Sequence, residues 1–494
     1  MEDLSLRKKN LIMFPLGTVG RDMMYNLFTS QLLTFVLFTR MLSAAQLTAI
    51  TAIMVAARVF DALNDPIMGN IIERTRSRYG KFKPWLVIGV LSSSVVVYLT
   101  FNVRLQGWAF VWFFGLMYFM YSITYTMHDI AYWGMVPALS SDADARNQFT
   151  ARATLFAGIG GTLASILIPM FSAGNLTIGG SASVAYGRIA LAICVLAPLF
   201  LAFTVFGVRE RRDDMAEAAP PVSLKKIFST IAGNDQLLWI ALIFLIQQVG
   251  NNLVLGGIGS TYIYFEFGYE GGLYSLFTTV GMSATAFLMI FYPAISRRIT
   301  RKRLMGIMML ISVAGYALML IPGLALSAGT VKFIFIVLGY MLSNFGQYCY
   351  YLIMMISIIN TVEYSEYRTG SRDEAIIASL RPFITKLASA LTVAITSASY
   401  IIFGVTGFTN QISALEQSCT QGVITETEKL SRIADALSGV RAGQNMGLLV
   451  CMTLLPCLLM LASYLLYKRR YKLDEAEYDR ICAAIAARKN EAAE

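Results

Sequence analysis

Two carboxylates inside an apolar segment are the residues of this sequence best suited to chemistry. Asp61 and Asp65 lie four residues apart in RVFDALNDPIMG, so on a helix they share one face. Arg58 and Asn64 each lie three residues from Asp61 and fall near the same face. Carboxylates in a lipid-length segment are costly unless they meet a partner or a cavity. Two interpretations stay open: an Arg58–Asp61 ion pair that joins helices, or oxygen ligands for a small, hard monovalent cation.

A second polar stripe occurs in the later apolar run YTMHDIAYWGMVP. Thr126, Asp129 and Trp133 follow one another at i, i+3 and i+7, which places them on one side of a helix. An aromatic plane beside carboxylates suits a sugar, because the ring stacks on its C–H face while the acids accept hydrogen bonds from its hydroxyls. Trp133 alone would equally fit a lipid-interface anchor. Asp22 is another acid within an apolar run, and Arg152 is a candidate counter-ion for Asp22 or Asp129.

Membrane-spanning helices must position these side chains. The chain has 494 residues, of which 56% are hydrophobic and only 14% are charged, with a mean hydropathy of +0.60. Repeated apolar runs of roughly 20 residues are typical of transmembrane helices. We therefore expect an all-α membrane protein with twelve spans, at about 10–39, 46–72, 83–103, 107–138, 147–173, 185–208, 236–267, 270–294, 303–324, 330–362, 374–404 and 443–468.

The distribution of Lys and Arg predicts the orientation of these spans. If the N-terminus is cytoplasmic, cytoplasmic segments hold 28 of the 40 basic residues and outside segments hold seven. This bias places both termini in the cytoplasm of a cell-membrane protein. Basic loops facing anionic lipid headgroups also account for the net charge of +10, so nucleic acid is not implied as a partner.

The spans are expected to form two six-helix bundles. The break at 209–235 contains Pro220-Pro221 and mixed charges, which are typical of a linker. Pro66 in the second span and Pro293 in the eighth are each followed by a basic loop. Two such halves indicate the major facilitator fold. The expected domains are an N-terminal bundle, a cytoplasmic linker, a C-terminal bundle and a cytoplasmic tail, at 1–208, 209–235, 236–468 and 469–494.

Further charged residues are candidates for gating and for substrate contact. The loop after the second span carries the basic residues Arg74, Arg76, Arg78 and Lys81, and the loop after the tenth carries the acids Glu363 and Glu366. Ion pairs between the two loops would close an inner gate. Alternatively, these residues only set the topology. In the eleventh span Arg381 and Lys386 lie five residues apart, about 140° around a helix. Both are long enough to bend toward one ligand.

Four motifs together carry a family resemblance. The stretches DALNDPIMG with TRSRYGKFKPW, YTMHDIAYWGMVP and EYSEYRTGSRDEA, followed by Lys386, resemble the glycoside–pentoside–hexuronide:cation symporters of the major facilitator superfamily. The resemblance covers the first eleven spans. It implies a cation site for Na⁺, Li⁺ or H⁺, with Na⁺ held at Asp61 and Asp65, and further residues in named roles. The cation site is completed by Asn64 and Thr126, and the sugar site comprises Asp22, Asp129, Trp133, Arg152 and Lys386.

The expected function is cation-coupled symport of a small sugar or glycoside by alternating access, by a chain that acts as a monomer in the lipid bilayer. The alternatives are a lysolipid-type carrier of the same fold and a carrier of an acidic glycoside, a hexuronide, because Arg381 adds positive charge to Lys386 and Arg152. An enzyme is not expected: the chain has one histidine, no HExxH and no GxSxG. No cofactor is expected beyond the coupling ion. The outside segment 406–442 and the tail 469–494 each contain an expected extra helix without an assigned role.

Overall fold

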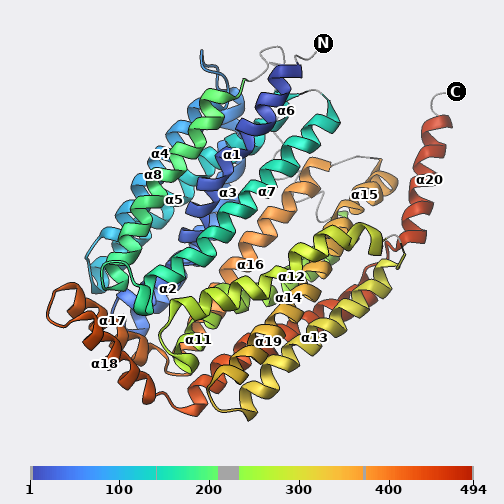
Figure 1. The fold of residues 1–494 in the computed structure, drawn as a ribbon. Helices are drawn as coiled ribbons and strands as arrows, with labels where there is room; N and C mark the ends of the chain where they lie inside the picture. Colours follow the sequence, from blue (N-terminus) through green and yellow to red (C-terminus); the bar gives the residue numbers. More distant parts are fainter. Residues whose placement is uncertain (1–3, 141, 210–232, 297, 371–373, 492–494) are drawn as a thin grey trace. The chain divides into compact units, whose positions relative to one another are not determined.

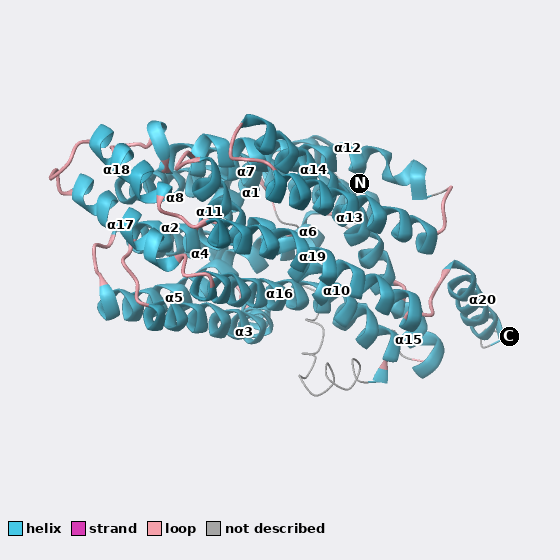
Figure 2. Cartoon of the chain, turned by 90° about the horizontal axis from the view of Figure 1, so that it is seen from below, coloured by secondary structure: helices cyan, strands magenta, loops and turns pink. Residues whose placement is uncertain are grey.

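The computed structural model describes residues 4–491 apart from 141, 210–232, 297 and 371–373 (Figure 1). Within these ranges all regular structure is helical and no strand occurs (Figure 2). This confirms the expected all-α class. The chain divides into two compact units, and each is described by itself below.

The first half of the sequence contributes helices that correspond to the first six expected spans. They are α1 (Leu4–Thr29), α2 (Leu32–Thr39), α3 (Ala44–Arg74), α4 (Lys83–Asn102), α5 (Gly107–Gly134), α6 (Val136–Leu139), α7 (Ala143–Ser172), the 3₁₀ turn η1 (Gly174–Leu176) and α8 (Ala182–Gly207).

The second half contributes the remaining helices, one of which is interrupted between α10 and α11. They are α10 (Asp235–Leu253), the π-helical turn η2 (Val254–Ile258), α11 (Gly259–Phe267), α12 (Gly271–Ser296), α13 (Arg301–Ala325), α14 (Thr330–Ile359), α15 (Thr361–Thr369), α16 (Glu374–Ile402), α17 (Thr406–Thr420), α18 (Glu426–Ser438), α19 (Ala442–Arg470) and α20 (Glu475–Glu491). The break between α10 and α11 coincides with Gly257, whose φ of 113° lies in the region that favours glycine.

Local sequence signals explain where several helices begin. Ser43 and Gln46 form a capping box at the start of α3, each side chain bonding the other residue's backbone. Asp142 accepts hydrogen bonds from the backbone of Asp144 and Ala145 at the start of α7, and Asn234 accepts one from Leu237 at the start of α10. These caps fix the ends of helices that carry or support the candidate sites.

Ten helical segments among the described residues are long and apolar enough to cross a membrane. They include α3, α4, α5, α7 and α8 in the first half of the sequence. The helices α1 and α12 cover two further expected spans and are not among the ten. The chain is thus a multi-pass membrane protein, and the full number of twelve spans stays a prediction.

The first compact unit comprises residues 1–220, 263–276 and 400–444. Within it α1 packs on α7 and α8, α4 packs on α5 and α8, and α3 packs on α5. The helix α17 packs on α2 and on α18, so a segment late in the sequence lies beside one near its start (Figure 1). The expected division at 208 and 236 differs from these units by the segments 263–276 and 400–444, and most of the expected linker lies outside the described residues.

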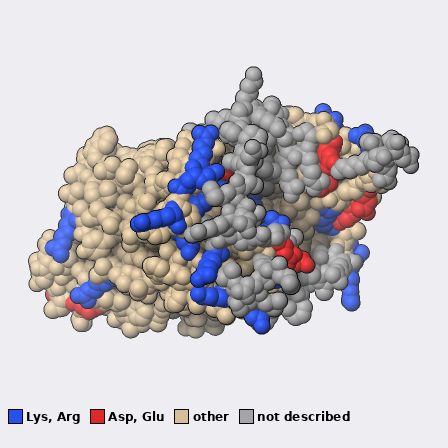
Figure 3. All heavy atoms as spheres, turned by 90° about the horizontal axis from the view of Figure 1, so that it is seen from above, with Lys and Arg blue, Asp and Glu red and all other residues tan. Residues whose placement is uncertain are grey.

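The second compact unit comprises residues 221–262, 277–399 and 445–494. Its core is built around the contact of α13 with α14, and α10 packs on α14 from another side. The expected tail helix is present as α20, which packs on α15 and buries Ile481 in the core. On the face shown in Figure 3, Lys and Arg side chains are more frequent than Asp and Glu.

Candidate sugar and cation sites

A buried arginine joins the two acids that the sequence assigns to substrate. Arg21 on α1 donates from Nε and Nη2 to Asp22 Oδ2, at 3.0 and 2.8 Å. Its Nη1 donates to Asp129 Oδ1 on α5 at 3.0 Å. The Arg21 side chain is 4% exposed, whereas those of Asp22 and Asp129 are 20% and 37% exposed. The Arg21 guanidinium is therefore buried. Both carboxylates retain accessible oxygens that can accept hydrogen bonds from a ligand.

Aromatic rings surround this arginine. Its guanidinium carbon lies 5.0 Å from the ring centre of Tyr132 and 5.1 Å from that of Trp133. Tyr132 is held by a hydrogen bond to the Phe14 carbonyl at 2.6 Å and stacks on the Phe14 ring. The expected alignment of Asp129 with Trp133 is thus present, because both approach the same guanidinium.

The expected partner of Asp22 and Asp129 was Arg152, and here the structure corrects the sequence analysis. Arg21 bridges the two acids, while the exposed Arg152 on α7 donates to the backbone carbonyl of Leu11 at 3.3 Å. Arg21 directly precedes Asp22, and a fork of guanidinium donors reaches two carboxylates at once. Sequence spacing cannot choose between Arg21 and Arg152, because the choice depends on how α1, α5 and α7 are rotated.

The acids of α3 face polar groups of α5. Arg58 Nη1 lies 3.6 Å from Asp61 Oδ2, and these two side chains are 9% and 8% exposed. The Ser122 hydroxyl donates to Asp61 Oδ1, and the Thr126 hydroxyl donates to Asp65 Oδ1 at 3.2 Å. The Arg58–Asp61 ion pair of the first interpretation is therefore formed, and the oxygen ligands of the second lie beside it.

Ser122 is a residue that the sequence analysis missed. It precedes Thr126 by four residues and so begins the stripe that continues through Asp129 and Trp133. That spacing was the available signal. Ser122 and Thr126 supply hydroxyl oxygens next to the two acids of α3, and hard monovalent cations prefer such oxygen ligands.

The side-chain amide of Asn64 and one backbone carbonyl of α3 also lie near Asp61 and Asp65 in the sequence. The Nδ2 atom of Asn64 is buried without a hydrogen-bond partner among the described residues. Pro66 lies inside α3 and cannot donate to the carbonyl of residue 62, which leaves one helix oxygen without its usual partner. No group of three or more His, Cys, Asp or Glu side chains with metal-binding geometry occurs among the described residues.

The candidate residues of the eleventh span belong to the second unit. Arg381 is exposed on α16 and donates from Nη2 to the Tyr351 hydroxyl at 3.0 Å. Lys386 is half-buried on the same helix. The spacing of five residues thus places the two side chains in different environments. Among the polar residues of α10, Gln247 is buried and donates to Gln347 Oε1 of α14 at 3.0 Å, so it joins helices.

The candidate gating residues lie at helix ends and in one loop. Arg74 ends α3, and Arg76 donates to the carbonyls of Glu73 and Thr75, at 3.0 and 3.3 Å. Arg78 and Lys81 lie over the rings of Tyr79 and Phe82. Glu363 and Glu366 are half-buried on α15 of the second unit. Ion pairing between the two sets stays a prediction.

Comparison with known proteins identifies the family to which this chain belongs. Residues 13–475 match the family described as MFS/sugar transport protein. The lactose permease of Leuconostoc lactis is 30% identical over 421 residues, covering 80% of this chain and 63% of the permease. The raffinose carrier protein of Pediococcus pentosaceus is 28% identical over 412 residues, covering 80% of this chain and 62% of the carrier. The matches thus span less than two thirds of the length of these relatives.

Solved structures show the same fold. A bacterial homologue of the human lysosomal transporter Spinster, in an inward-facing and unoccupied conformation, aligns with a TM-score of 0.62 and 12% sequence identity. The alignment covers 95% of this chain and all of that one. Helical fold, membrane spans and family match define a membrane transporter rather than an enzyme. The chain belongs to the MFS/sugar transport family and, within it, to the glycoside–pentoside–hexuronide symporters.

Proposed function

We propose that this protein is a symporter that carries a small sugar or glycoside together with a monovalent cation by alternating access. The observation that carries the proposal is the Arg21 guanidinium, buried between the accessible carboxylates of Asp22 and Asp129 and beside Trp133. The arginine lies between both carboxylates, and charged acceptors make strong hydrogen bonds to hydroxyl groups. The names of the relatives, a lactose permease and a raffinose carrier, support a sugar as the substrate class.

In this proposal the sugar accepts and donates hydrogen bonds at a few fixed positions. Asp22 and Asp129 accept from its hydroxyls, and Trp133 stacks on its apolar face. Arg152 and Lys386 are proposed as further contacts, since both are long side chains with accessible atoms. Such a site prefers a compact polyhydroxyl ligand over a long acyl chain, which speaks against the lysolipid alternative.

The proposed cation ligands are Asp61, Asn64, Asp65 and Thr126, with Na⁺ as the first candidate and H⁺ or Li⁺ as alternatives. Support comes from the hydroxyls of Ser122 and Thr126 bonded to the two acids. Arg58 already neutralises one side of Asp61, so an ion there would share the acid with the guanidinium. Asp65 is half-buried and accepts a hydrogen bond from the Thr126 hydroxyl.

Twelve spans with both termini in the cytoplasm are part of the proposal, supported by the bias of basic residues toward the expected cytoplasmic segments. Closure of the inner gate is proposed to use ion pairs between two sets of residues. The basic set is Arg74, Arg76, Arg78 and Lys81, and the acidic set is Glu363 and Glu366. The chain is proposed to work as a monomer in the cell membrane.

Uptake by purified protein in liposomes tests this function. A panel of radiolabelled mono- and disaccharides would be offered with an inward gradient of Na⁺, Li⁺ or H⁺, and with no gradient. The proposal expects concentrative uptake of at least one sugar that needs one of these gradients. Uptake that only equilibrates under every gradient would remove cation coupling, and no uptake of any sugar would remove the substrate class.

An acidic glycoside is a second candidate substrate. The exposed guanidinium of Arg381 is bound to a neutral tyrosine hydroxyl and therefore keeps its charge available for an anion. Hexuronides added to the same panel decide between the two substrate classes.

A further inference from the structure

A hairpin late in the sequence belongs to the first compact unit. The helices α17 and α18, residues 406–438, are called the α17–α18 hairpin here. They lie within the segment 400–444 that is part of the first unit, although the chain before and after this segment, 277–399 and 445–494, belongs to the second. The chain therefore leaves the second unit, folds onto the first and returns.

A buried ion pair fixes the centre of the hairpin. Glu416 of α17 and Lys429 of α18 are both 0% exposed, with Nζ and Oε1 3.4 Å apart. Lys429 Nζ also donates to the Gly180 carbonyl at 2.7 Å, and the Ala182 backbone N–H donates to Glu416 Oε2 at 2.7 Å. Buried charges need such partners, and Gly180 before α8 and Ala182 at its start each supply one. The pair therefore joins the two hairpin helices and anchors both to the first unit.

Polar contacts along α17 extend the anchor. Asn410 accepts a hydrogen bond from the Leu42 backbone N–H at 2.9 Å and donates to the Leu42 carbonyl at 2.8 Å. Ser413 donates to the carbonyls at the end of α2, and the hydroxyls of Thr420 and Ser181 lie 2.7 Å apart. These bonds connect α17 to two separate places in the first unit, so the hairpin cannot pivot on either alone.

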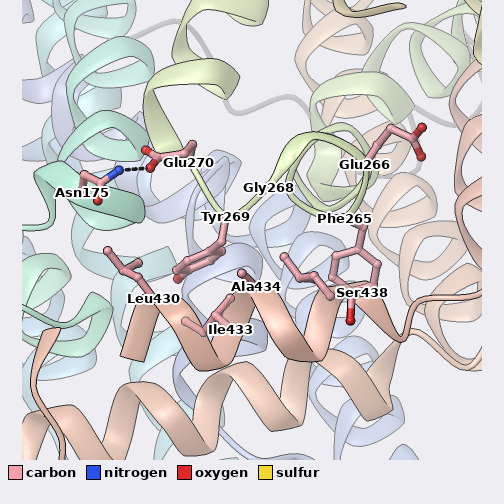
Figure 4. A pocket seen from close by; sticks show the side chains of 11 residues that line it. Asn175, Phe265, Glu266, Gly268, Tyr269, Glu270, Leu430, Ile433, Ala434 and Ser438 are labelled. Atoms are coloured by element: carbon pink, nitrogen blue, oxygen red, sulfur yellow. Dashed lines mark hydrogen bonds between the residues drawn. The ribbon is translucent and has the colours of Figure 1, made fainter. Parts of the chain in front are cut away.

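The hairpin also faces the link between α11 and α12, where the Tyr269 hydroxyl is hydrogen-bonded to Glu416. A cavity of about 400 Å³ lies beneath α18, with Leu430 and Ile433 on one side and Tyr269 and Glu270 on the other (Figure 4). Glu270 is bonded to Asn175 rather than to the hairpin (Figure 4). The polar contacts of the hairpin thus reach the end of α2, the start of α8 and, through Tyr269, the link between α11 and α12.

Two short junctions connect the hairpin to α16 and α19, whose ends at 400–402 and 442–444 still belong to the first unit while the rest of each helix belongs to the second. Residues 403–405 follow α16, and residues 439–441 precede α19. Gly404 has a φ of 66°, which favours glycine, and Gln444 Nε2 donates to the carbonyls of Phe403 and Gly404 at 3.1 and 3.4 Å. From Ile402 to Thr406 the chain can extend to at most about 14 Å. The junctions are thus side by side, short and bonded to each other.

We propose that the α17–α18 hairpin is a tether that stays docked on the first unit. Through its two junctions it limits how far the parts of α16 and α19 that belong to the second unit can move away during transport. The proposal depends on the proposed function only in that alternating access requires such movement. The buried ion pair and the bonds of α17 stay intact, and the junctions absorb the change in backbone angles.

A disulfide tests whether the hairpin stays docked. Ser181→Cys with Thr420→Cys places two sulfur atoms where hydroxyls now lie 2.7 Å apart, in a background with Cys419→Ser to prevent mispairing. After oxidation, verified by mass, sugar uptake is expected to stay within twofold of the reduced protein. The two single-cysteine variants, oxidised in the same way, are the controls. Uptake that falls on oxidation and returns with reductant would show that the hairpin must undock, and would overturn the proposal.

Spin-label distances test whether the junctions limit movement. Labels at Leu105→Cys and Ser327→Cys, in exposed loops of the first and second units, report separation by pulsed electron resonance in nanodiscs. Inserting Gly-Ser-Gly-Ser after Phe403 and after Val440 adds up to roughly 13 Å of reach per junction. This variant is expected to show longer and broader distances than the parent. The same insertion after Gly422, at the exposed tip of the hairpin, is the matched control and should not.

Identical distance distributions in the junction and tip variants would overturn the tether. The distances are measured without any sugar, so a protein that transports none of the sugars offered still answers the question. If no sugar is taken up but the distances lengthen in the junction variant and not in the tip variant, the proposed function is contradicted and the tether is supported.

Discussion

The Thr126 hydroxyl on α5 lies 3.2 Å from Oδ1 of Asp65 on α3. Asp129, which contacts Arg21, follows Thr126 by three residues on the same helix. The proposed cation ligands and the proposed sugar ligands thus share one helix face. An ion bound at Asp65 would pull on α5 at Thr126 and so change the position of Asp129, which is a physical route for coupling the two sites.

This relationship predicts separable roles for Asp65 and Asp129. Asp65→Cys should retain measurable sugar binding but lose its dependence on Na⁺, whereas Asp129→Cys should lose sugar binding and retain Na⁺ binding. Coupling energies between such sites are about 1–3 kcal/mol, or roughly 5–150-fold in affinity. Titration calorimetry of sugar with and without Na⁺ measures both. A full Na⁺ effect in Asp65→Cys would place the cation elsewhere.

Arg21 should matter more for sugar binding than Arg152. Arg21→Gln leaves two neighbouring carboxylates without their shared cation, and Asp129 is 37% exposed, so solvent offsets part of the loss. We expect sugar affinity to fall by about tenfold or more, that is ~1.4 kcal/mol. Arg152→Gln removes a hydrogen bond to one backbone carbonyl and is expected to have the smaller effect. Calorimetry on both variants decides, and the reverse order would return the role to Arg152.

Ser122 should tune the cation site. Ser122→Ala removes the hydroxyl that donates to Asp61, and hydrogen bonds to charged groups contribute about 1.5–3 kcal/mol. The Na⁺ concentration for half-maximal uptake is expected to rise about tenfold or more, with sugar affinity at saturating Na⁺ little changed. Ser92→Ala on α4, whose hydroxyl bonds only its own helix, is the control. Equal Na⁺ dependence in the two variants would leave Ser122 with a purely structural role.

Arg381 should determine whether acidic glycosides compete. If its guanidinium meets an anionic sugar, Arg381→Gln should weaken competition by a hexuronide and spare that by a neutral glycoside. Tyr351→Phe removes the hydroxyl bonded to Arg381 but keeps the charge, so it should preserve the preference. Competition with labelled substrate in liposomes is the measurement. If acidic sugars never compete with wild-type protein, the hexuronide alternative is removed.

Topology can be checked with tags alone. Tags inserted at 215–220 and at the C-terminus should report the cytoplasm, and a tag at 420–430 should report the outside, because basic residues favour the cytoplasmic segments. Gly422 is exposed between α17 and α18 and is a suitable position. Finding 215–220 and 420–430 on one side of the membrane would contradict the two-bundle arrangement.

Hydropathy and helical spacing by themselves determined the all-α membrane class, the helices of the tail and of 406–442, and the shared face of Asp61 and Asp65. They also placed Thr126, Asp129 and Trp133 on one stripe, because residues three and four apart meet on any helix. The tertiary structure decided which arginine lies between Asp22 and Asp129, brought Ser122 to Asp61, and docked α17 on α2. Those pairings depend on how each helix is rotated and packed against its neighbours, and lipid-facing and partner-facing apolar residues look alike in a sequence.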